Sequence, residues 1–181
     1  MKPIIFMLLI FSTSVFADAR TDKIEDFFKQ VISLKKQYQK KYSEAVNENF
    51  PKYQEITNID FTIQKLYIEI QTIKFKYLIK NNPNTFNLSK GFNGLMNHGW
   101  NTGNDKYLPA INPKYNDIKN EIKRLRIKSK TFKEKRKELR AEMKNSPANQ
   151  TLKNIRKKAK KEFDTLNEKI IKYNNSIKKD V

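Results

Sequence analysis

Apolar residues recur at steps of three and four positions along the first half of the chain, which is the spacing of an amphipathic helix. The apolar stripe of the first segment consists of Ile24, Phe27, Val31, Leu34, Tyr38, Tyr42 and Ala45. Asp22 and Glu25 place negative charge in its first turn, where it interacts favourably with the helix dipole. The pattern predicts a helix from about residue 22 to residue 49.

A second helix is predicted after Pro51, because proline is tolerated in the first turn of a helix. Its apolar stripe consists of Ile56, Ile59, Ile63, Leu66, Ile70, Ile73 and Tyr77. Residues 67–79 are also rich in β-branched and aromatic side chains, so a strand there is a competing interpretation. Strict alternation fails at Thr72 and Ile73, so we favour the helix. We expect it to end before Pro83, because the residue before a proline is disfavoured in helical geometry.

Two more helical stripes occupy the second half of the chain. The third stripe consists of Tyr115, Ile118, Ile122, Leu125, Phe132, Leu139 and Met143. Ser129 and Arg136 take its two remaining positions. Residues 145–150 contain Pro147 and predict a turn between antiparallel helices. The fourth stripe consists of Leu152, Ile155, Ala159, Phe163, Leu166, Ile170, Tyr173 and Ile177.

These four segments predict an all-α protein made of two long antiparallel helical hairpins, over residues 18–82 and 114–181. A four-helix bundle and an extended coiled coil both satisfy this pattern. An irregular insert over residues 83–113, rich in glycine and aromatic residues, joins the hairpins. We expect residues 18–181 to form a single helical domain, and the apolar stripes also allow an oligomer, because they can be covered within one chain or between chains.

Arg136 is a charged residue at a position of the apolar stripe. We expect its stem to cover apolar surface while its guanidinium reaches water. The alternative is that it pairs with a carboxylate or fixes the register of the helices.

The insert gathers the four glycines of the chain, its one tryptophan and its one histidine. Our first interpretation is a compact loop whose aromatic side chains close one end of the bundle. The second is a ligand or partner loop formed by Phe92, His98, Trp100 and Tyr107. Catalysis by His98 is the third interpretation, since that histidine would have to be the base of any serine triad.

Residues 1–17 have the layout of a cleaved secretory signal peptide. Lys2 precedes an uninterrupted apolar run over residues 3–11, and Val15 and Ala17 occupy the positions expected before a cleavage site. As a helix, residues 3–16 would rise only about 21 Å, against a bilayer core of roughly 30 Å. We therefore expect an exported protein, periplasmic or secreted, with no transmembrane segment after cleavage. The chain has no cysteine, so disulfides and thiolate chemistry are excluded.

The formal net charge of +19 is concentrated in one part of the chain. Residues 119–161 hold eighteen Lys and Arg against four acids, a local net charge of +14. Such a surface selects polyanions as a class without identifying one. The predicted polyanion-binding residues are Lys133, Lys135, Arg136, Lys137, Arg140, Lys144, Lys153, Arg156, Lys157, Lys158, Lys160 and Lys161.

No enzyme motif accompanies these features. The sequence has no GxSxG elbow, HExxH helix, phosphate-binding glycine loop or dinucleotide fingerprint, and no spacing typical of a zinc site. We therefore predict no catalytic residues, no metal and no cofactor. The predicted function is an exported, non-enzymatic helical interaction protein that binds an anionic envelope or host surface, or an acidic protein, through its basic C-terminal hairpin. Nucleic acid would be bound without sequence specificity. The alternatives are a periplasmic chaperone-like or structural oligomer, and an enzyme with its site in residues 86–108.

Overall fold

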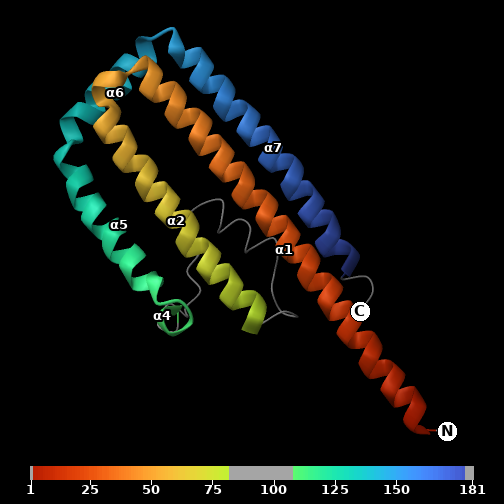
Figure 1. The fold of residues 1–181 in the computed structure, drawn as a ribbon. Helices are drawn as coiled ribbons and strands as arrows, with labels where there is room; N and C mark the ends of the chain where they lie inside the picture. Colours follow the sequence, from red (N-terminus) through yellow and green to blue (C-terminus); the bar gives the residue numbers. More distant parts are fainter. Residues whose placement is uncertain (1, 82–107, 178–181) are drawn as a thin grey trace.

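The computed structural model describes residues 2–81 and 108–177, and every element in these two ranges is a helix (Figure 1). The elements are α1 (Lys2–Asn49), the 3₁₀ helix η1 (Pro51–Tyr53), α2 (Gln54–Asn81), α4 (Leu108–Ile111), α5 (Lys114–Thr131), α6 (Lys133–Asn145) and α7 (Ala148–Ile177). The predicted all-α class is confirmed, and residues 67–79 are helical. None of the helices in the described part of the chain combines the length and apolar character needed to cross a membrane.

The helices α1 and α2 form a central antiparallel pair, with η1 in the turn between them (Figure 1). α7 packs along α1, and α5 packs along α2. α6 meets the start of α7 at the end of the molecule where α1 turns into α2. The third and fourth predicted segments therefore meet near their connecting turn and then dock on different members of the central pair.

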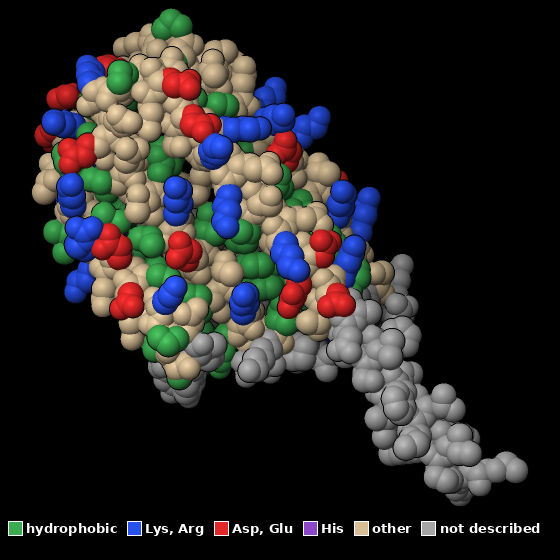
Figure 2. Space-filling model, viewed as in Figure 1, with side chains coloured by type: hydrophobic (Ala, Val, Ile, Leu, Met, Phe, Trp, Pro, Cys, Tyr) green, Lys and Arg blue, Asp and Glu red, His purple; other side chains and the backbone are tan. Residues whose placement is uncertain are grey.

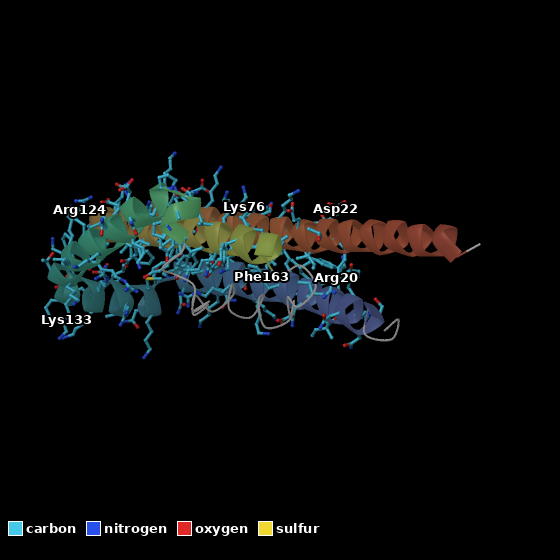
Figure 3. The ribbon with its side chains drawn as sticks, turned by 90° about the horizontal axis from the view of Figure 1, so that it is seen from below. Arg20, Asp22, Lys76, Arg124, Lys133 and Phe163 are labelled. Carbon is cyan, nitrogen blue, oxygen red and sulfur yellow. The ribbon has the colours of Figure 1, made fainter. Side chains whose placement is uncertain are left out.

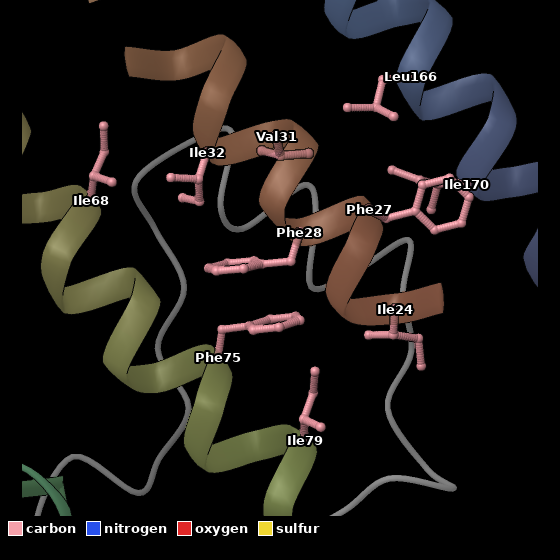
Figure 4. Close-up of a cluster of buried hydrophobic side chains, with 10 residues drawn as sticks. All are labelled: Ile24, Phe27, Phe28, Val31, Ile32, Ile68, Phe75, Ile79, Leu166 and Ile170. Atoms are coloured by element: carbon pink, nitrogen blue, oxygen red, sulfur yellow. The ribbon is translucent and has the colours of Figure 1, made fainter. Parts of the chain in front are cut away.

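The interface of α1 with α2 and α7 contains the first of three apolar clusters (Figure 4). The rings of Phe28 on α1 and Phe75 on α2 are stacked, with centroids 3.6 Å apart and an angle of 4° between their planes. Leu166 and Ile170 of α7 reach the same cluster from the other side of α1. α1 is thus covered on two sides.

α2 carries two apolar stripes, which explains its high content of isoleucine. The predicted stripe contributes Ile70 and Ile73 to a second cluster with α4 and α5. Ile68, Phe75 and Ile79 form another stripe, which packs against α1. The predicted stripe alone did not reveal that α2 is buried on two faces. The mixture of β-branched and aromatic residues that suggested a strand reflects this double burial.

Polar side chains interrupt the core of the α1–α2 pair. Lys35 and Gln39 on α1 and Gln71 on α2 are all buried. The ammonium group of Lys35 donates to the Gln71 side-chain oxygen at 3.4 Å. Burial lowers the pKa of Lys35 from its ordinary value of 10.5 to about 8, because desolvation disfavours the charged form.

Replacing Phe28 with alanine is expected to lower the free energy of unfolding by about 3–5 kcal/mol, because it removes a buried ring and leaves a cavity. Urea denaturation followed by circular dichroism measures this loss. Ile127→Ala is the control, since Ile127 is 60 % exposed and its loss should change stability by less than about 0.5 kcal/mol. Equal effects of the two substitutions would contradict the position of the Phe28–Phe75 contact in the core.

The buried Lys35 predicts a rise of stability with pH. Between pH 8 and 10.5 the unfolded chain binds more protons at this lysine than the folded chain does, so the free energy of unfolding increases with pH. Relative to Lys35→Met, the wild-type protein should gain about 3 kcal/mol across that window. Denaturation at pH 7, 8.5 and 10 tests this, with Lys36→Met at the neighbouring exposed lysine as the control. A difference between wild type and Lys35→Met that is independent of pH would contradict it.

Candidate functional site

The twelve predicted cations lie on two helices that meet at one end of the molecule. All of them except Arg136 are exposed, and Figure 3 shows Lys133 at the end that also holds Arg124 of α5. We call the eleven exposed cations the α6–α7 basic surface: Lys133, Lys135, Lys137, Arg140, Lys144, Lys153, Arg156, Lys157, Lys158, Lys160 and Lys161.

The turn between α6 and α7 is built from local hydrogen bonds. Ser146 has extended backbone angles, φ −83° and ψ 144°, as an N-cap residue does. Its Oγ accepts the Ala148 N–H at 3.1 Å. The Asn149 side chain donates to the Lys144 carbonyl at 2.9 Å. The turn therefore satisfies groups that the two helix ends would otherwise leave unpaired.

Apolar contacts set which side of α6 and α7 faces the core. Leu139 of α6 and Ala148 and Leu152 of α7 pack against Val46 and Phe50 at the end of α1. Because these residues occupy the inner stripe, the cations project from the outer sides of the two helices. The orientation of the basic surface thus follows from hydrophobic burial.

The two helices differ in how their charge is balanced. α6 includes three acids, and Lys137 pairs with Glu134 at 2.9 Å. The first half of α7 places six cations between Lys153 and Lys161 with no acid among them. Within the part of the chain that the structure describes, Lys153, Lys157, Lys158 and Lys161 take part in no ion pair. The α7 segment is therefore the less compensated half of the α6–α7 basic surface.

Two cations of α7 already have partners. The guanidinium of Arg156 lies 4.9 Å from the ring centre of Tyr42 on α1 and donates a hydrogen bond to its hydroxyl. Lys160 pairs with Asp164 one turn further along, at 2.5 Å. The contact of Arg156 with Tyr42 links the basic segment of α7 to the aromatic side chains of the central pair.

Arg136 does not extend its guanidinium into water, and the alternative of a carboxylate partner holds. Its side chain is 19 % exposed and binds Asp60 on α2, with Nη2–Oδ1 at 2.5 Å and Nε–Oδ2 at 3.2 Å. It also donates to the carbonyl oxygen and to Oγ of Ser129. Arg136 is thus a structural residue that faces α2, although it was predicted to bind polyanions.

This contact explains why the third predicted helix is two helices. The chain leaves helical geometry at Phe132, with φ −95° and ψ 20°, and the Phe132 N–H bonds to the Ser129 carbonyl at 3.3 Å. That carbonyl also accepts from the Arg136 guanidinium. The side chain of Arg136 therefore donates a hydrogen bond to the Ser129 carbonyl at the break. Asp60 on α2 bonds to Ser129 of α5 and to Arg136 of α6, and it holds both helices against α2.

A second polar contact ties α6 to the turn between α1 and α2. Glu142 accepts hydrogen bonds from the Lys52 ammonium and from the Tyr53 hydroxyl, the latter at 2.7 Å. The bond from Lys52, followed by that from Tyr53, holds the pKa of Glu142 below its usual value. Glu142 is thus an anchor of the helix that carries half of the basic surface.

The residues predicted as a ligand or partner loop, namely Phe92, His98, Trp100 and Tyr107, lie outside the described residues. The end of the predicted insert contains the short helix α4, whose Leu108 is fully buried against α2 and α5. Among the described residues, no group of three or more His, Cys, Asp or Glu side chains could hold a metal ion.

Comparison of the chain with protein-family models, with curated proteins and with solved structures finds no match. The charges and contacts of this chain are therefore the basis on which its function is inferred. The exposed cations of α6 and α7 spread positive charge over an extended surface.

Sequence reasoning missed a second group of cations, on the face that α5 shares with α2. Lys119, Lys123, Arg126 and Lys130 line a groove there together with the buried Lys74. The excess of positive charge in residues 119–161 included these four cations of α5. The contribution of Lys74 depends on how α5 docks on α2, and no local pattern indicates it.

We predict that Arg136 and Asp60 are energetically coupled. In a double-mutant cycle of Arg136→Met and Asp60→Asn, the interaction energy should be about 1–2 kcal/mol, because the pair is bidentate and half-buried. Urea denaturation of the four proteins measures it. The exposed Lys137–Glu134 pair is the matched control and should give at most about 0.5 kcal/mol. Equal coupling in both cycles would show that Arg136 contributes no more than a surface pair.

Proposed function

We propose that this protein is exported, is not an enzyme, and binds an anionic surface or an acidic partner through the α6–α7 basic surface. The observation that carries this proposal is the acid-free run of cations between Lys153 and Lys161 on an exposed side of α7. Coulomb attraction acts between this run and any dense array of negative charge. It requires no pocket and no chemistry beyond the fixed charges.

The rigidity of the supporting helix adds to the proposal. α7 packs along α1, with Leu152 in one apolar cluster and Leu166 and Ile170 in another. The cations between these anchors are therefore held on one helix before a ligand arrives. A preorganised charged surface loses less conformational entropy on binding than a flexible basic tail.

The distribution of acids also favours this end of the molecule. On the face drawn in Figure 2, Lys and Arg side chains alternate with Asp and Glu over much of the surface. Such mixed areas offer an anion both attraction and repulsion. The segment of α7 before Glu162 offers attraction alone, and this difference supports its choice as the contact surface.

Charge reversal on α7 tests the proposal. Lys157→Glu, Lys158→Glu and Lys161→Glu together should weaken binding to phosphatidylglycerol vesicles at least about 100-fold, since each basic residue near an anionic membrane contributes about 1 kcal/mol. Co-sedimentation at 50 and 300 mM salt measures the affinity and its screening. A parallel titration with poly-glutamate distinguishes an anionic surface from an acidic polymer partner.

The matched control is Lys36→Glu, Lys65→Glu and Lys76→Glu, which changes the net charge equally at exposed positions on α1 and α2. It should retain most of the binding, and circular dichroism should show unchanged helicity in both triple variants. If the two variants lose affinity to the same extent, net charge alone governs binding and the assignment to α7 is wrong. Binding whose affinity changes neither with salt concentration nor with the charge reversals would contradict the proposal.

A further inference from the structure

A groove of about 700 Å³ runs between α2 and α5, away from the α6–α7 basic surface. This volume lies within the range of about 300–1,000 Å³ that small-molecule sites usually occupy. Its lining residues are Tyr67, Ile70, Lys74, Tyr115, Lys119, Ile122, Lys123, Arg126, Ile127, Ser129 and Lys130. Basic and apolar side chains thus share one concave surface.

The charge of this groove has one sign. Five cations line it, and no Asp or Glu does so among the residues that the structure describes. Lys74 is only 8 % exposed and has an interaction of its own within the protein, so the four cations of α5 are the ones available to a ligand. Like charges held together in a partly enclosed site repel one another. A bound anion would relieve that repulsion.

The inner surface of the groove is apolar and aromatic. Ile70, Ile122 and Tyr115 are buried there as part of the α2–α5 cluster. Ile127 stands at the groove with 60 % of its surface exposed, which is a large exposure for an isoleucine. A hydrocarbon group that lay along these side chains would be removed from water.

Contacts with aromatic rings position two of the cations over the groove. The Lys119 ammonium lies 5.3 Å from the centre of the Tyr115 ring, and the Arg126 guanidinium lies 5.3 Å from that of Tyr67. Cation–π attraction favours these positions. The charged groups are thus held beside the apolar surface.

We propose that the α2–α5 groove binds an anionic amphiphile with a single hydrocarbon chain. The anionic headgroup would contact Lys119, Lys123, Arg126 and Lys130, and the chain would lie on the isoleucine and tyrosine side chains. An inorganic anion would leave the apolar surface uncovered, and a neutral amphiphile would make no use of the positive charge of Lys119, Lys123, Arg126 and Lys130. Only a ligand with both parts matches the whole lining.

Two other grooves in the described part of the chain lack this combination. A larger one of about 1040 Å³ along α1 and α2 includes Glu44 and Glu69 among its lysines. The groove between α1 and α7, about 650 Å³, includes Glu162. Carboxylates in both sites would repel an anionic headgroup. The groove between α2 and α5 is therefore the better candidate for this ligand class.

The test compares three probes by isothermal titration calorimetry below their micelle-forming concentrations: dodecyl phosphate, inorganic phosphate and dodecyl maltoside. Dodecyl phosphate should bind with one site, and the other two should bind at least tenfold more weakly. Lys123→Gln, Arg126→Gln and Lys130→Gln together should lower the affinity for dodecyl phosphate at least tenfold. Ile127→Gln, at an exposed position, should lower the affinity for dodecyl phosphate about threefold without loss of helicity.

The matched control is Lys36→Gln, Lys65→Gln and Lys76→Gln, which removes the same charge at exposed positions of α1 and α2, outside both the groove and the α6–α7 basic surface, and should leave dodecyl phosphate binding unchanged. Equal loss in the control, equal affinity for dodecyl maltoside, or full affinity of the groove variant would each overturn the inference. The result is independent of vesicle binding through α7, because the groove and the α6–α7 basic surface have no residue in common.

Discussion

The packing of α1 against α2 is the interaction on which the positions of the other helices depend. Phe28 and Phe75 stack at its centre, and each helix presents a second apolar face outward from the pair. α7 docks on the free face of α1, and α5 docks on that of α2. The central pair fixes the positions of these two faces relative to each other. The basic helices therefore depend on a contact between two segments that carry little of the charge excess.

Hydrophobic anchoring and a few polar contacts hold the concentrated positive charge in place. Leu139 and Leu152 bury the inner sides of α6 and α7, while Arg136 with Asp60 and Lys52 with Glu142 tie α6 to the central pair. Repulsion among the remaining cations acts along the surface, where water and salt screen it. The fold thus tolerates the high net charge by placing it outside the core.

Much of the fold could be predicted because its signals are local. Pro51 and Pro147 mark the turns, and the steps of three and four residues mark the helices. The break at Phe132 could not be found this way, since the apolar stripe continues across it from Leu125 to Leu139. Its cause includes Asp60, which is 76 positions from Arg136. The basic surface was visible in composition, whereas the partner of Arg136 was not.

The amino-acid sequence by itself determined the helical class, the turns at Pro51 and Pro147, and the concentration of positive charge in residues 119–161. Tertiary structure alone decided which apolar faces meet, that Arg136 is used inside the fold, and that Lys74 joins four cations of α5 beside one groove. The physical reason is the range of the interactions. Periodicity and capping act between residues a few positions apart, but the pairing of helix faces depends on the complementarity of surfaces contributed by distant segments.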